Sequence, residues 1–232
     1  MTQKAGSYDT NKLEDLSLEK NRLEKQLTNF LELESRLLRA VGLEKSKKIL
    51  EVGSGIGQIS KMLLGIAPKA QLTAIEYSDD FVKEWKKRLA SEIASQQAEM
   101  IHGDAHDIIP QLTPNYDFSY LRFVAQHIPQ PGTLLKRIAK VTVPGGHIAL
   151  VDSDDQLVIN YPYDLEVRNL LKKIQEAQRQ QGGDRYIGRK QICLLSQSGF
   201  IPQKAQVIHF TNKELPFDLL WELSFGFKST LV

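Results

Sequence analysis

The sequence is poor in cysteine, in excess charge and in long apolar runs. Its 232 residues contain one cysteine, Cys193, which excludes an internal disulfide and a metal site built from several cysteines. The 30 basic and 28 acidic residues nearly balance, so no overall field attracts nucleic acid or an anionic membrane. No stretch approaches the roughly 20 apolar residues that span a bilayer, and the N-terminus lacks the apolar core of a signal peptide. We therefore expect a cytoplasmic protein with small or uncharged partners and no membrane span.

What the chain does contain is strong periodicity. Apolar residues recur at helical spacing from Leu13 to Val41, which predicts one long amphipathic helix or two. Residues 1–45 are expected to form a helical lid over the open end of the domain. Cys193 lies among apolar neighbours in QICLLSQSGF, so we expect its side chain to be buried.

Between residues 46 and 155, short apolar runs alternate with helical patterns. The runs are KKILEVG, QLTAIEY, AEMIHGD, YDFSYLRF and GGHIALVDSD, and the helical patterns are GQISKMLLGIA, DDFVKEWKKRLASEI and PGTLLKRIAKV. Such alternation predicts an α/β fold with a Rossmann-like, doubly wound, mostly parallel sheet. Residues 156–232 are expected to add further helices, the substrate side and a sixth strand, KAQVIHF.

The most informative stretch is the loop after the first of these strands, EVGSGIG. Gly53, Gly55 and Gly57 allow a sharp turn and a close approach of the backbone to a ligand. The helix that follows offers free N–H groups to an anionic group. The spacing G-x-G-x-G differs from the dinucleotide fingerprint G-x-G-x-x-G, and the stretch has no phosphate-loop lysine. An NAD-dependent dehydrogenase and an ATPase are therefore disfavoured.

Acidic residues also end the next two strands. Glu76 stands where a carboxylate can accept hydrogen bonds from both hydroxyls of a ribose. Asp104 stands where it can receive the exocyclic amine of an adenine, beside the backbone N–H of Ala105, although aspartate is also a favoured helix cap. The ends of three strands are thus expected to contact one nucleoside.

The ordered set E-x-G-x-G-x-G, the acidic end of the second strand, GDA after the third and PGG before the fifth resembles class I S-adenosylmethionine-dependent methyltransferases. RLEKQ, YLRFVAQHIPQPGTLLKRIAKVTVPGGHIALVD and GGDRYIGRK are similar to the small-molecule, ubiquinone/menaquinone-methyltransferase-like type. The resemblance covers roughly residues 13–200. It implies S-adenosyl-L-methionine as cofactor and S-adenosyl-L-homocysteine as product. The cofactor-binding residues that it implies are Glu51, Gly53, Ser54, Gly55, Gly57, Glu76, Tyr77, Asp104, Ala105, Leu121 and Arg122.

Methyl transfer from a sulfonium is an in-line substitution, so the protein chiefly aligns the reactants and a base is optional. His127 and Asp152 are the candidate catalytic residues, with a structural role as the alternative for each. No metal-ligand spacing occurs among the histidines. The candidate residues for the acceptor, expected to be a small organic molecule, are Tyr8, Tyr161, Arg185 and Arg189.

Against the family pattern, the chain offers no candidate for a final antiparallel strand. An apolar C-terminal helix carrying Trp221, Phe225 and Phe227 would then be available to a second subunit, so both a monomer and a homodimer are expected states. An RNA or protein methyltransferase and a non-catalytic S-adenosylmethionine-binding protein remain the alternatives. The lack of a basic run with interleaved aromatics disfavours nucleic acid as a partner.

Overall fold

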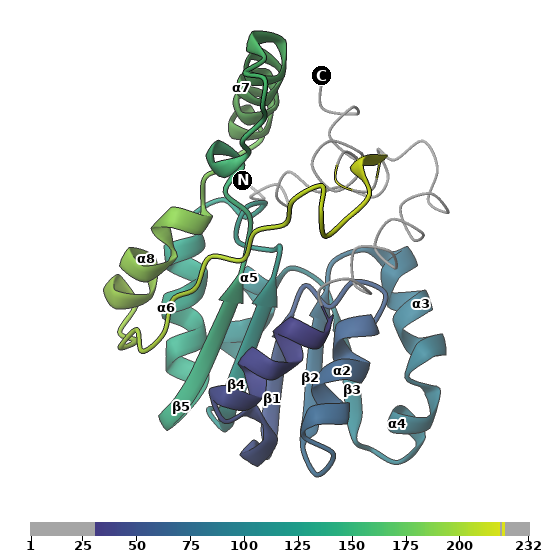
Figure 1. Ribbon diagram of the computed structural model, residues 1–232. Helices are drawn as coiled ribbons and strands as arrows, with labels where there is room; N and C mark the ends of the chain where they lie inside the picture. Colours follow the sequence, from purple (N-terminus) through teal and green to yellow (C-terminus); the bar gives the residue numbers. More distant parts are fainter. Residues whose placement is uncertain (1–30, 219, 221–232) are drawn as a thin grey trace.

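The structure, a computed structural model, describes residues 31–218 and residue 220 (Figure 1). The part of the predicted leading helix that falls in this range is helical over residues 31–40. Tyr8, Trp221, Phe225 and Phe227 lie outside the described residues. Among the residues described, no helix combines the length and the apolar character needed to cross a membrane.

Five parallel strands form one sheet in the order β3-β2-β1-β4-β5. The strands are β1 (Lys48–Val52), β2 (Gln71–Glu76), β3 (Ala98–His102), β4 (Tyr116–Arg122) and β5 (Thr142–Val151). The order reverses between β1 and β4, which is where open α/β sheets bind ligands. The predicted α/β class and the predicted parallel sheet are confirmed.

Helices cover both faces of the sheet (Figure 1). The α-helices are α2 (Gln58–Ile66), α3 (Asp79–Arg88), α4 (Ala90–Ala94), α5 (Ala105–Ile108), α6 (Pro131–Val141), α7 (Leu165–Gln180) and α8 (Gln191–Gln197). Short 3₁₀ turns are η2 (Leu43–Lys45), η3 (Ile109–Gln111), η4 (Asp155–Leu157) and η5 (Gly188–Lys190). In Figure 1, α7 projects away from the layers formed by the sheet and the other helices.

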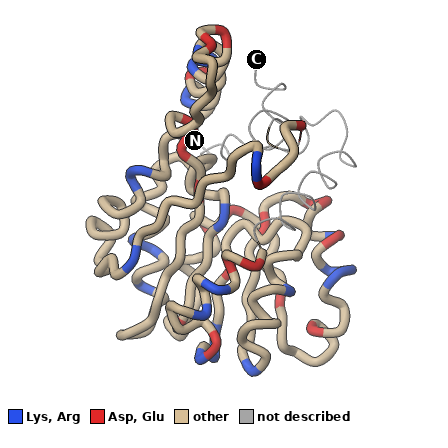
Figure 2. The backbone as a smooth tube through the Cα atoms, viewed as in Figure 1, with Lys and Arg blue, Asp and Glu red and all other residues tan. Residues whose placement is uncertain are grey.

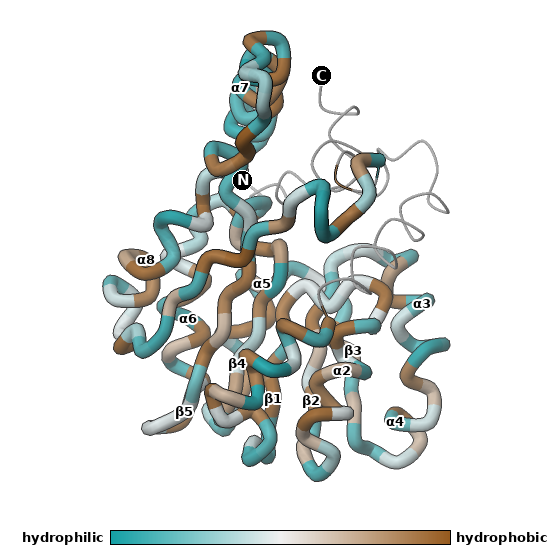
Figure 3. Tube along the Cα trace, viewed as in Figure 1, coloured by the Kyte–Doolittle hydropathy of each residue, from teal (hydrophilic) through white to brown (hydrophobic). Residues whose placement is uncertain are grey.

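The core consists of one apolar cluster on each face of the sheet, because each strand is hydrophobic on both sides (Figure 3). On one face, the helix of residues 31–40, α2 and α3 pack Leu38, Leu63 and Trp85 over the strands. On the other, α6 contributes Leu134 and Ile138, with half-buried side chains of α8 behind it. Both clusters end near the carboxyl edge of the sheet, so that edge sits on a rigid base.

Two predictions about the C-terminal part are wrong. The segment KAQVIHF (residues 204–210) is not a strand: it is not part of the five-stranded sheet, and most of its side chains are exposed. A β-prone segment becomes a strand only where a neighbour pairs with it. Cys193 is exposed rather than buried. It lies on the outer side of α8, while Leu194 and Leu195 face the core.

The close packing behind the glycine loop predicts how glycine substitutions change the free energy of unfolding. At Gly57 the φ angle is +84° and an added Cβ would lie 2.7 Å from Leu89 Cδ1 and 2.9 Å from Trp85 Cδ1. Gly57→Ala should therefore lower the free energy of unfolding by about 2–4 kcal/mol. Gly65→Ala in α2 is the matched control, because an added Cβ meets nothing within 4 Å there. It should raise stability by about 0.5–1 kcal/mol. Urea unfolding of both variants measures the difference, and equal midpoints would contradict the packing argument.

Candidate functional site

A cleft of about 2150 Å³ opens at the carboxyl edge of the sheet and continues along β5 to its amino end. Its lining includes the ends of four strands and part of the helix of residues 31–40. Drug-sized ligands usually occupy about 300–1,000 Å³, so the cleft has room for a nucleoside and a second molecule. The residues that line it divide into an end beside β1 and β2, and an end beside β4 and β5.

The glycine loop forms the floor of the first end. Gly53, Gly55 and Gly57 all have positive φ angles, of 70°, 55° and 84°. Gly55 lines the cleft and an added Cβ would meet nothing within 4 Å, so the open space beside it belongs to the cleft. Gly57 faces Trp85 and Leu89 instead. Gly57 therefore joins the loop to α3, whereas Gly55 leaves the backbone accessible to a ligand.

The Glu76 carboxylate holds this loop against the end of β2. Its Oε2 accepts a hydrogen bond from the Gly55 N–H at 2.8 Å, and its Oε1 accepts from the Tyr77 and Ser78 N–H groups at 2.9 Å each. Burial raises the pKa of Glu76, and these hydrogen bonds oppose the rise. A carboxylate has about four lone-pair positions, so at least one remains for a ligand hydroxyl.

Glu51 lies beneath the loop and is 2% exposed. Ser60 donates to Glu51 Oε2 at 2.5 Å and accepts a hydrogen bond from Trp85 Nε1 at 2.7 Å. Burial raises the pKa of Glu51 to about 8, and the Ser60 hydrogen bond opposes that shift. Ser60 and Trp85 were not predicted as part of the site. They lie on different helices, α2 and α3, and the sequence does not show that these helices meet at Glu51.

Asp104 follows β3 by two residues and caps α5, where its Oδ1 accepts from the His106 N–H at 2.8 Å. Both Asp104 and Ala105 line the cleft, as does Tyr77, which is 51% exposed. The capping role and a ligand contact through the other carboxylate oxygen are compatible. The glycine loop, Glu76 and Asp104, which follow or end β1, β2 and β3, thus all line the cleft.

Arg122 ends β4 and forms a buried ion pair with Glu34 from the helix of residues 31–40. Its Nε donates to Glu34 Oε2 at 3.0 Å, and its guanidinium lies 4.5 Å from the centre of the Phe123 ring. Burial raises the pKa of Glu34 while Arg122 opposes the rise. The neighbouring Leu121 points into the core and is 1% exposed, so only its backbone can contact a ligand. No sequence pattern predicted that Glu34 belongs to this site.

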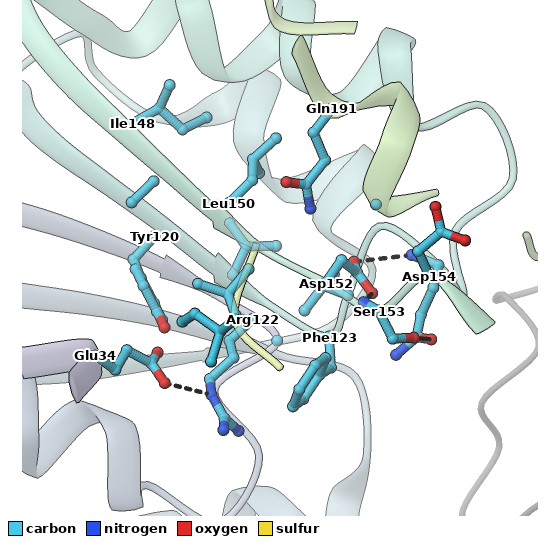
Figure 4. Close-up of a pocket in the computed structure, with 18 of the residues that line it drawn as sticks. Glu34, Tyr120, Arg122, Phe123, Ile148, Leu150, Asp152, Ser153, Asp154 and Gln191 are labelled. Carbon is cyan, nitrogen blue, oxygen red and sulfur yellow. Dashed lines mark hydrogen bonds and ion pairs between the residues drawn. The ribbon is translucent and has the colours of Figure 1, made fainter. Parts of the chain in front are cut away.

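Asp152 lies at the end of β5, at the other end of the cleft (Figure 4). The carboxylate accepts hydrogen bonds from the Gln126 N–H and the Ser153 N–H, both at 3.1 Å. Burial raises its pKa to about 7, against those hydrogen bonds. His127 lines the same cleft, and its Nδ1 lies 3.4 Å from Gln178 Nε2. Both candidate bases therefore border the cleft.

The predicted arginine cluster is engaged within the protein. Arg185 is 3% exposed and forms two 2.8 Å hydrogen bonds with the Asp155 carboxylate. Arg189 makes the same kind of pair with Asp154, at 2.6 and 2.8 Å. These bidentate pairs connect the segment after α7 to the end of β5, which argues against a free anion-binding cluster for an acceptor. Tyr161 is 98% exposed on the rim.

Comparison with known proteins identifies the domain that carries this cleft. Residues 50–150 match the family described as a methyltransferase domain. This part of the chain is a methyltransferase domain. The match spans β1 to β5 and so includes the glycine loop, Glu76, Asp104 and Arg122.

Curated relatives share this domain at low identity. The chain is 24% identical over 117 residues to demethylmenaquinone methyltransferase of Listeria monocytogenes, covering 50% of this chain and 48% of that protein. It is 29% identical over 133 residues to methyltransferase str3 of Strobilurus tenacellus, covering 57% and 45%. The chain therefore spans about half the length of these relatives.

Solved structures agree on the fold of the methyltransferase domain. Mitomycin 7-O-methyltransferase superposes with a TM-score of 0.55 at 17% identity, covering 75% of this chain and 51% of that chain. A SAM-dependent methyltransferase from Aquifex aeolicus gives 0.52 at 18% identity, covering 71% and 77%. At such identities the likeness concerns the fold alone.

The buried position of Glu51 makes the stability of the methyltransferase domain depend on pH. Its pKa is about 8 in the folded protein, against an ordinary value of 4.5. The resulting stabilisation is complete below about pH 4.5 and is lost as pH rises through 8. As pH rises from about 5.5 to 8.5, the free energy of unfolding of the wild type should therefore fall. In Glu51→Gln this fall should be smaller, by on the order of 3 kcal/mol.

Urea unfolding at several pH values measures this difference. Glu44→Gln is the control, because Glu44 is exposed, and its curve should parallel that of the wild type. If Glu51→Gln also parallels the wild type, Glu51 titrates as an ordinary carboxyl group.

Proposed function

We propose that the protein transfers a methyl group from S-adenosyl-L-methionine to a small organic acceptor, with S-adenosyl-L-homocysteine as product. The observation that carries the proposal is the cleft of the methyltransferase domain, in which the open backbone at Gly55, the Glu76 carboxylate and Asp104 share one wall. An RNA acceptor finds no support, because basic and acidic residues are interspersed along the described chain (Figure 2).

The residues fit this cofactor on several points. Glu76 keeps an acceptor position for a ribose hydroxyl, Tyr77 offers an exposed aromatic face, and Asp104 and Ala105 border the place of the adenine. The Ser54 hydroxyl is buried without a hydrogen-bond partner among the described residues and lines the cleft. When bound, the cofactor supplies an electrophilic methyl group and its own leaving group.

The acceptor belongs at the end of the cleft beside β5. Ile148, Leu150 and Phe123 form an apolar part of the wall there, and Asp152, Ser153, Asp154 and Gln191 form a polar part beside the end of the strand (Figure 4). An apolar wall beside the buried Asp152 carboxyl group suits an organic molecule that carries an ionisable hydroxyl group. Asp152 would accept the hydroxyl proton, with His127 as the second candidate base. The pairs Arg185–Asp155 and Arg189–Asp154 would hold this wall in place.

Calorimetric titration and a labelled-methyl assay test the function. S-adenosyl-L-homocysteine should bind and NAD should not, and label from S-adenosyl-L-methionine should pass to some members of a small-molecule acceptor library. Preference for NAD would refute the proposal. Binding without transfer to any acceptor would point to a non-catalytic binding protein, and transfer only to RNA or protein would refute the small-molecule part.

Glu76 provides the residue-level prediction for cofactor binding. Glu76→Ala should weaken S-adenosyl-L-homocysteine binding by about tenfold to several hundredfold, because a charge-assisted hydrogen bond is worth roughly 1.5–3 kcal/mol. Glu76→Gln keeps an acceptor oxygen for the Tyr77 and Ser78 N–H groups and should lose less. The affinities of the wild type and of Glu76→Ala should differ less for the 2′-deoxy form of S-adenosyl-L-homocysteine than for S-adenosyl-L-homocysteine itself. If the wild type shows no preference for the 2′-hydroxyl, the ribose lies elsewhere.

Asp152 provides the prediction for the chemical step. A base must be ionised to accept a proton, so kcat/KM with a phenolic acceptor should rise with pH through about 7. Asp152→Asn should lower kcat by at least about a hundredfold and remove this step from the pH profile. His127→Gln is the comparison, and it should keep the step. A step that disappears in His127→Gln and persists in Asp152→Asn would make His127 the base.

A further inference from the structure

Gln178, in the last turn of α7, is completely buried against the loop that follows β4. The residue is 0% exposed. Its Nε2 lies 2.8 Å from the Gln126 carbonyl oxygen and 3.4 Å from Nδ1 of His127. Its Oε1 is buried and has no hydrogen-bond partner among residues 31–218 and 220. A buried amide with one unpaired atom is costly, so the contacts of Nε2 are the favourable half of this arrangement.

The Gln126 carbonyl group fixes which way this amide points. A carbonyl oxygen can only accept hydrogen bonds, so the Gln178 atom beside it is the Nε2 donor rather than Oε1. The Asp184 N–H also donates to the Gln126 oxygen, at 2.8 Å, and holds this carbonyl group beside the end of α7. The second N–H of the Gln178 amide is therefore the hydrogen shared with His127 Nδ1.

A donor at His127 Nδ1 determines the tautomer of the ring. A neutral imidazole has one nitrogen that carries a hydrogen and one that carries a lone pair. Because Nδ1 faces a donor, Nδ1 provides the lone pair and the ring hydrogen lies on Nε2. The neutral ring of His127 then has no second lone pair with which to accept a substrate proton.

We propose that Gln178 is a positioning residue that holds His127 as the Nε2–H tautomer, which makes His127 a hydrogen-bond donor and leaves Asp152 as the base. Any hydrogen bond between the ring and the oxygen of the methyl acceptor is then donated by Nε2. The hydroxyl proton of the methyl acceptor goes to the Asp152 carboxylate, its oxygen forms the bond to the methyl carbon, and the electron pair of the broken C–S bond stays on sulfur. His127 keeps its proton throughout. Its role toward the methyl acceptor rests on the proposed function, whereas its tautomer does not.

Gln126 connects the proposed donor to the proposed base. Its N–H donates to Asp152 Oδ2 at 3.1 Å, and His127 is the next residue in the chain. Its side-chain Oε1 accepts hydrogen bonds from Ser153 Oγ at 2.9 Å and from Arg185 Nη1 at 2.6 Å. Asp152 and His127 are thus held by one stretch of backbone, and both line the cleft. This arrangement suits a proton acceptor and a hydrogen-bond donor that act on one hydroxyl group.

Long-range proton–nitrogen NMR of the histidine rings measures the tautomer in the wild type. A ring nitrogen that carries a hydrogen and one that carries a lone pair differ in chemical shift, and the signals of His127 are those missing from His127→Gln. In spectra recorded over a series of pH values, the neutral His127 ring should carry its hydrogen on Nε2. A hydrogen on Nδ1 would overturn the proposal, whether or not the protein transfers methyl groups.

Gln178→Glu reverses the contact, because an ionised carboxylate only accepts hydrogen bonds. The hydrogen of the His127 ring should move to Nδ1, and kcat should fall at least about tenfold. The affinity for S-adenosyl-L-homocysteine should stay within about twofold. Gln180→Glu is the matched control, because Gln180 lies in the same turn of α7 and is exposed, and it should change neither the tautomer nor kcat. An unchanged tautomer in Gln178→Glu would overturn the proposal.

A buried carboxylate can prevent folding, so Gln178→Leu, which removes the donor without adding a charge, is prepared as well. The Nε2–H form of His127 should be less populated in it than in the wild type, and the rise of kcat/KM with pH that is assigned to Asp152 should persist. A population of Nε2–H equal to that of the wild type would mean that Gln178 does not set the tautomer. If the wild type transfers no methyl group, the proposed function fails and the role toward the methyl acceptor fails with it, while the NMR spectra still decide the tautomer.

Discussion

The hydrogen bonds from the Gly55, Tyr77 and Ser78 N–H groups to the Glu76 carboxylate fix the two strand ends on which the site depends. They hold the glycine loop that follows β1 against the end of β2. Gly55 and Glu76, which one of these hydrogen bonds joins, lie 21 positions apart in the sequence. Because Gly55 has positive φ and open space beside it, the loop can take this path without blocking the cleft. Disrupting the carboxylate would release both the loop and the place proposed for the ribose.

A second property of the cleft is its number of buried carboxyl groups. Glu34, Glu51, Glu76 and Asp152 all line it, and burial raises the pKa of each. A cationic ligand would favour the ionised form of these groups and lower their pKa values, because the attraction between opposite charges is stronger at low dielectric. A sulfonium with an α-ammonium group matches this arrangement. The desolvation of these groups therefore favours the proposed cofactor over an anionic dinucleotide.

At the other end of the cleft, internal ion pairs have replaced the anion-binding cluster that the sequence suggested. Arg185 and Arg189 stand close together in the sequence, but each meets a carboxylate from the segment after β5. The side chains that line the proposed acceptor end include the apolar Ile148 and Leu150 and the two candidate bases, Asp152 and His127. This favours acceptors with a hydroxyl group over acceptors recognised by a negative charge.

The sequence by itself determined the alternation of strands and helices, the glycine loop and the acidic strand ends, because these depend on local periodicity and on residues near one another in the chain. Asp104 shows the same locality, since both its strand-end position and its capping role were readable from GDA. Tertiary structure decided whatever depends on a partner distant in sequence. Glu34 contacts Arg122 across 88 positions, Arg185 contacts Asp155 across 30, and the segment of residues 204–210 is not part of the described sheet. Cys193 is exposed because α8 packs a different face, with Leu194 and Leu195, against the cluster that includes α6. The apolar neighbours of the cysteine in the sequence do not show which face this is.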